Sequence, residues 1–205
     1  MSTTLFPQRI VPLPPAIHSG GKPLHEVLSQ RRSCRTFRRR HLSPTELSQL
    51  CWAAQGVTST EGARTSPSAG GLFPVTVLVA TEEGLFEYLP RKHALWERQT
   101  GDMRTSLQRV AFDQPFLSHA AATFILAIDV GVTAAEYSRL AQRYCDIEVG
   151  HVSQNLLLEA TSLGLGCVPV GLFDENLLRS ALNLGSKLEP VYLLPVGEPA
   201  SRSDA

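Results

Sequence analysis

The spacing of apolar residues predicts a chain in which helices and strands are mixed. Ser43-Pro44-Thr45-Glu46 has the pattern of a capping box with proline in the first turn, and the apolar face after it predicts a helix up to Gly56. Between residues 142 and 163 the chain lacks proline and is apolar on most sides. This indicates a buried helix, either at the centre of the domain or in a subunit interface. Gly164 and Gly166 are typical of its end. Shorter helices are expected at residues 23–32, at 102–112, from Ala134 with Thr133 as its cap, and from the cap Asp174 to Leu182.

Short apolar runs rich in β-branched residues predict strands between these helices. They lie at residues 74–80, 85–88 after a turn at Glu83-Gly84, 121–129, 167–170 and 191–196, and a loop is expected at 57–72. The order of elements has no regular βαβ rhythm, and no glycine-rich turn follows an early strand. The pattern therefore favours an α+β layer fold over a doubly wound, dinucleotide-binding sheet.

Composition is typical of a soluble globular protein with one domain. The chain has 205 residues, 43% of them hydrophobic and 19% charged, and no apolar run reaches the length of a membrane span. We expect a proline-rich extended arm at residues 1–21, a single domain at 22–199 and a tail at 200–205. The four cysteines are widely spaced and form no CxxC pair, so neither a metal site nor a disulfide framework is expected and a cytoplasmic location is the default.

Positive charge is concentrated near the N-terminus. Six of the ten residues 31–40 are arginine, in a chain whose formal net charge is zero. Arginine presents a planar fork of donors that fits phosphate oxygens, so the cluster indicates an anion site. A solvated face, a nucleic-acid patch and a targeting signal are the alternatives. The balanced charge and a pI near 7 argue against general nucleic-acid binding. Arg38, Arg39 and Arg40 are expected to be surface charges rather than ligands.

Four segments in order carry a more specific signal: Arg31-Arg32-Ser33-Cys34-Arg35-Thr36-Phe37, residues 66–74, residues 150–156, and residues 164–174 closed by 195–199. With them, the chain resembles the flavin-dependent nitroreductase superfamily and, within it, the SagB-type dehydrogenases, which include the oxidases that turn azolines into azoles in ribosomal peptides. The resemblance implies a nitroreductase-like α+β fold with a central, mainly antiparallel sheet flanked by helices. It also implies an intertwined homodimer with one FMN in each of two clefts at the interface.

The resemblance also implies which residues bind FMN. They are Arg31, Arg32, Ser33, Arg35, Pro67, Ser68, Ala69, Gly71, Gln154, Pro169, Val170, Gly171, Leu172 and Arg202. Arg31 would hold the phosphate, and Arg35 would lie near N1 and O2, where a fixed cation favours reduction. Residues 67–71 would come from the other subunit and line the ring, and a backbone N–H of residue 171 or 172 would point at N5. Gln154 and the nearby His151 have an alternative role as hydrogen-bonded packing residues in a dimer core.

Two departures from the family pattern limit which function can be inferred from the resemblance. Many nitroreductases have an asparagine where this chain has Gly71, so one polar contact to the flavin is lost or replaced by backbone. The azoline oxidases use a lysine–tyrosine pair before the long helix, where this chain has Glu136-Tyr137. Glu136 and Tyr137 are therefore the candidates for the catalytic base, with packing as the alternative role of Tyr137. Residues 57–66 and 88–118 are the candidates for a substrate lid.

The expected function is an FMN-dependent oxidoreductase in which hydride passes through flavin N5. The leading version is a SagB-type dehydrogenase or oxidase that acts on a small-molecule or peptide-derived substrate and passes electrons to oxygen. The alternatives are an NAD(P)H-dependent nitro or quinone reductase and a non-catalytic flavin-binding or partner subunit. In the last case Phe73, Leu172 and Phe173 are the candidates for blocking the ring face. No nucleic acid, membrane or metal partner is expected.

Overall fold

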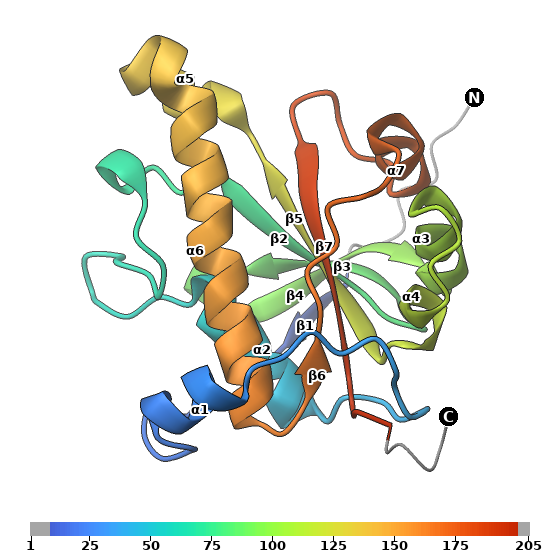
Figure 1. Cartoon of the computed structure of the whole chain (residues 1–205). Coiled ribbons are helices and arrows are strands. Elements are labelled where there is room, and N and C mark those ends of the chain that lie inside the picture. The colour runs from blue at the N-terminus through green and yellow to red at the C-terminus, as the bar shows by residue number, and fades with distance from the viewer. Residues whose placement is uncertain (1–8, 201–205) are drawn as a thin grey trace.

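The computed structural model describes residues 9–200, and a seven-stranded sheet forms its centre (Figure 1). The strands run in the order β1-β4-β3-β2-β5-β7-β6, and every pair of neighbours is antiparallel. Their bounds are β1 Ile10–Pro12, β2 Val75–Ala80, β3 Gly84–Leu89, β4 Ala94–Thr100, β5 Ala122–Ile128, β6 Gly166–Cys167 and β7 Glu189–Gly197. This topology confirms the predicted α+β class with a mainly antiparallel sheet.

Helices cover both faces of the sheet. Their bounds are α1 Leu24–Gln30, α2 Pro44–Gln55, α3 Arg104–Val110, α4 Phe116–His119, α5 Val130–Tyr137, α6 Ala141–Ser162 and α7 Glu175–Ala181, with short 3-10 turns at Ala69–Gly71, Pro90–Lys92 and Ser138–Leu140. Side chains alternate along β2 as the pleat requires. Val75, Val77 and Val79 pack with α2 and α6, whereas Leu78 and Ala80 pack with α3, α4 and α7. None of the helices in residues 9–200 is both long and apolar enough to cross a membrane.

The structure confirms three predicted helix ends that depend on capping interactions between residues close in sequence. Ser43 and Glu46 form both hydrogen bonds of the capping box at the start of α2. After α6, Gly164 has φ +74°, and the N–H groups of Gly164 and Leu165 donate to the carbonyls of Thr161 and Ala160. This is the Schellman arrangement, which favours glycine at its left-handed position. The Asp174 side chain caps α7 by accepting from the N–H of Leu177.

Residues 10–12 of the expected arm form β1, which pairs with β4. Two local predictions were wrong. Asp129, not Thr133, caps α5, since its side chain accepts from the N–H of Gly131, and Thr133 is buried inside the helix. Residues 88–118 are no lid in the structure, because β4, α3 and α4 lie within them and contribute to the sheet and the core.

Candidate active site

The arginine segment, residues 31–37, lies against the β6 segment, residues 166–172. Ser33 forms an isolated parallel bridge with Cys167, and the N–H of Cys34 donates to the carbonyl of Cys167 at 3.0 Å. The approach is close, because a Cβ at Gly166 would lie 2.6 Å from Cys34 Sγ. Glycine at 166 thus has a packing reason beyond ending α6. The fold brings together two of the four motif segments, which are separated by more than 120 residues in sequence.

Two guanidinium groups of the arginine segment are available to an anion. Arg31 is half-buried and Arg35 is exposed, and within residues 9–200 neither guanidinium has a hydrogen bond or an ion pair to the protein. Arg32 is exposed and donates to the backbone carbonyls of Ser29 and Arg31 at 2.9 and 2.8 Å. Cations without a protein acceptor fit the predicted phosphate site.

Arg38 and Arg40, which were predicted to be surface charges, form ion pairs with carboxylates of the protein. Arg40 contacts Glu46 at 2.8 Å and Glu198 at 2.6 Å, and Arg38 contacts Glu198 at 3.1 Å. The hydrogen bond from Arg40 lowers the pKa of Glu46 to about 2. These ion pairs fasten the start of α2 to the chain after β7.

The end of the β6 segment exposes backbone donors. Val170 exchanges two hydrogen bonds with Leu193 of β7, and after it the chain leaves the sheet. Gly171 is exposed and Leu172 is 67% exposed. In the described part of the chain, their N–H groups have no hydrogen-bond acceptor. Free donors at this point are what the expected contact to flavin N5 requires.

The glycine segment, residues 66–73, has open space beside it. Gly70 and Gly71 have φ +61° and +67°, and no atom lies within 4 Å of where a Cβ of Gly71 would be. A Cβ at Gly70 would lie 3.0 Å from both Glu136 Oε2 and Tyr137 Oη. The structure therefore brings both catalytic candidates to the segment expected to line the ring. The Tyr137 ring also packs edge-on against Tyr144, with 5.0 Å between centroids.

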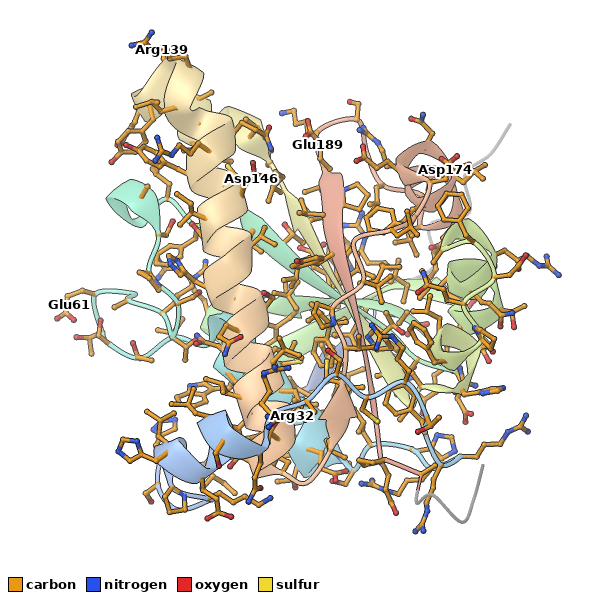
Figure 2. The ribbon with its side chains drawn as sticks, viewed as in Figure 1. Arg32, Glu61, Arg139, Asp146, Asp174 and Glu189 are labelled. Carbon is orange, nitrogen blue, oxygen red and sulfur yellow. The ribbon has the colours of Figure 1, made fainter. Side chains whose placement is uncertain are left out.

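Within one chain the two halves of the expected site are separated. In Figure 1 the loop that carries the glycine segment lies to the left of α6, and the β6 segment runs along its right. Figure 2 shows Arg32 in front of the lower end of α6 and Glu61, from the same loop as the glycine segment, far to the left. The predicted arrangement therefore requires that residues 67–71 come from a second subunit.

The sequence predicted that α6 is buried at the centre of the domain or in a subunit interface, and within one chain one side of it is exposed. Val149, Val152 and Leu156 are buried against the sheet, whereas Ile147, Gly150, His151 and Gln154 are exposed. His151 is therefore not a packing residue within one chain, and Gln154 makes no contact with the arginine segment that would place it at the phosphate site. Nothing lies within 4 Å of a Cβ at Gly150. The buried side of α6 fits the prediction of a helix at the centre of the domain, and the exposed stripe is the side that the predicted subunit interface would cover.

Other features lie outside this site. Arg202 is beyond the described residues. A largely apolar cavity of about 240 Å³ lies between β1, the start of α2 and β3, and no predicted site residue lines it. Residues 9–200 contain no group of three or more His, Cys, Asp or Glu side chains arranged for a metal ion.

The sequence analysis did not identify the buried Glu148 of α6. Its only signal in the sequence is a charged residue between two apolar neighbours.

Comparisons with known proteins agree with this fold and site. A family model described as the nitroreductase family matches residues 28–198. A Methanocaldococcus jannaschii protein with a provisional nitroreductase name is 38% identical over 180 residues, which are 85% of this chain and 90% of that protein. A crystal structure from Ralstonia eutropha JMP134, also provisionally called a nitroreductase, has a TM-score of 0.87 at 30% identity. It covers 95% of this chain and 91% of the other.

A third similarity concerns the fold alone. The Escherichia coli microcin synthetase McbBCD complex matches with a TM-score of 0.75 at 20% identity, over 84% of this chain and 70% of that one. The fold is the α+β scaffold of a nitroreductase-type oxidoreductase. The chain belongs to the nitroreductase family.

Proposed function

We propose that this protein is an FMN-dependent oxidoreductase that works as a homodimer. Members of its family typically bind FMN. The observation that carries the proposal is the contact of Ser33 and Cys34 with Cys167, which joins the segment that carries the unpaired guanidinium groups to the segment that ends in free backbone donors. The glycine segment on the other side of α6 would complete the cleft of the second subunit.

The described residues fit this cofactor. Arg31 and Arg35 supply positive charge for a phosphate and for the pyrimidine edge of the ring, and Gly171 and Leu172 supply N–H donors. Gly71, with open space around its Cβ position, permits a planar group to approach the backbone. FMN would supply the hydride chemistry, while these side chains bind it, orient it and stabilise negative charge near its ring.

The finer proposal is a SagB-type dehydrogenase or oxidase acting on a small-molecule or peptide-derived substrate. Its support is the position of Glu136 and Tyr137 beside Gly70. Glu136 is exposed, so its carboxylate can accept a proton from a bound substrate, and the Tyr137 hydroxyl can hold the substrate by a hydrogen bond. Oxygen would take the electrons in this version.

Two alternatives have their own support. The relatives at 38% and 30% identity are both called nitroreductases, which favours the nitro reductase among the NAD(P)H-dependent alternatives. A non-catalytic flavin-binding or partner subunit would require that a side chain covers the flavin ring. Leu172, at 67% exposed, is large enough to do so.

The test starts from the absorption spectrum and the molecular mass in solution of the purified protein. We expect a yellow dimer with a flavin band near ~450 nm. A colourless monomer that ignores added FMN would refute the proposal. Anaerobic mixing with NADPH then separates the two enzymes: rapid loss of the flavin band identifies the reductase, and slow loss favours the oxidase. Turnover that survives in both Glu136→Gln and Tyr137→Phe would remove these residues from catalysis.

A further inference from the structure

A buried carboxylate anchors the glycine segment. Glu148 lies in the middle of α6 and is only 3% exposed. It accepts a hydrogen bond from Gln55 of α2 at 3.3 Å, and the nearby Ser68 hydroxyl also favours its charged form. Burial raises the pKa of Glu148 and outweighs the opposite effect of these two polar neighbours. A buried charge is costly unless its partners compensate, so these contacts are essential to its placement.

Ser68 links α6 to the backbone of the glycine segment. Its Oγ accepts a hydrogen bond from the N–H of Phe73 at 2.8 Å. An ionised carboxylate has no proton to give, so Ser68 donates to Glu148 and keeps its lone pairs for Phe73. The side chain at the start of the segment is thereby joined both to the long helix and to the end of the segment.

The backbone between these points needs such support. Gly70, Gly71 and Phe73 all have positive φ, of +61°, +67° and +52°. For a residue with a side chain, the left-handed region costs roughly 1–2 kcal/mol. Conformations of this kind persist only where the surroundings hold them in place.

A second line of contacts reaches the same place. Arg64 donates to Gln55 Oε1 at 3.0 Å, and its guanidinium lies 4.2 Å from the centre of the Phe73 ring. Gln55 therefore bridges the positive Arg64 and the negative Glu148. These contacts connect Arg64, two residues before the glycine segment, with Phe73 at its end.

We infer that Glu148 is a positioning residue: through Ser68 it sets the conformation of residues 67–71 and, with it, the face offered to the flavin ring and the place of Gly70 beside Glu136. The inference rests on the proposed function, because that function gives residues 67–71 their role. Glu148 itself contacts neither flavin nor substrate in this arrangement.

The test compares Glu148→Gln with Glu159→Gln in the full-length dimer. Both glutamates lie on α6, both have a pKa raised by burial, and both bond to a glutamine, but Glu159 bonds to Gln49, away from the glycine segment. The first readout needs no cofactor. Hydrogen exchange at the amide of Phe73 should accelerate about tenfold or more in Glu148→Gln, as expected for loss of a charge-assisted bond, and stay unchanged in Glu159→Gln.

The second readout is the bound flavin. Glu148→Gln should change the visible circular dichroism of FMN and raise the substrate KM about tenfold, whereas Glu159→Gln should leave both unchanged. Ser68→Ala should reproduce these effects, and the double variant should be no worse than either single one. Ser68→Ala alone provides the test if Glu148→Gln does not fold.

The outcomes are separable. If wild-type protein binds FMN and Glu148→Gln matches it in exchange, dichroism and KM, the inference is wrong and the proposed function stands. If Glu148→Gln only lowers the melting temperature, Glu148 is a packing residue and the inference is also wrong. If the wild type binds no FMN, the proposed function fails and the inference fails with it.

Discussion

Replacing Arg31 with alanine should weaken FMN binding without unfolding the protein. The guanidinium of Arg31 has no acceptor within residues 9–200, so its removal breaks no contact of the described fold. Stability should therefore change by no more than ~0.5 kcal/mol. A charge-assisted hydrogen bond to a phosphate contributes about 1.5–3 kcal/mol, which corresponds to a rise in Kd of about 10- to 150-fold.

Arg39→Ala is the matched control for this experiment. Arg39 is exposed and lies eight positions further along the same run of arginines. It is a better control than Arg38 or Arg40, because those two are paired with Glu198. A solvated surface charge contributes little, so the Kd should change less than about twofold.

The assay is titration of flavin-free protein with FMN, followed by flavin fluorescence at two salt concentrations. Because the lost contact is electrostatic, binding by Arg31→Ala should depend less on salt than binding by the wild type. Equal Kd values for Arg31→Ala and Arg39→Ala would refute the assignment of Arg31 to the phosphate.

Three further predictions follow from the geometry. Gly71→Trp places a ring in the open space at a left-handed position, so it should cost about 1–2 kcal/mol of stability and abolish turnover; normal turnover would show that Gly71 is not beside the flavin. Gly150→Leu should leave the folded subunit intact and weaken the dimer in light scattering, and an unchanged dimer would exclude the exposed side of α6 as the interface. The Arg40 ion pair lowers the pKa of Glu46 to about 2, so Glu46→Gln should reduce the free energy of unfolding at pH 7 by up to about 3 kcal/mol. Since a lowered folded-state pKa stabilises only above the unfolded value, this difference should disappear as pH falls from about 4.5 to 2, and a difference that persists at pH 2 would contradict the ion-pair explanation.

Several features could be predicted from the sequence because they depend on interactions between residues close in the chain. The capping box at Ser43 and Glu46, the Schellman end of α6 at Gly164 and the Asp174 cap each depend on residues within a few positions of one another. The buried strands β2 and β5 were equally clear, because both faces of a central strand demand apolar side chains. The four motif segments in family order also indicated the fold and the arginine segment.

Two strands near one edge of the sheet and the start of α5 could be assigned only from the tertiary structure. The edge strand β1 has three residues, and its neighbour β4 carries charged side chains, so neither has a strong apolar pattern. Thr133 and Asp129 are both good caps, and only the end of β5 at Ile128 decided between them.

The sequence by itself determined the kind of scaffold and the residues that could hold an anion, because propensity, capping and motif order act over short stretches of chain. The tertiary structure decided what those residues face. It set the arginine segment against β6, put the glycine segment on the other side of α6, and placed Glu148 beneath Ser68. The physical reason is that burial and pairing are properties of neighbours in space, and a residue's neighbours in the sequence do not specify them.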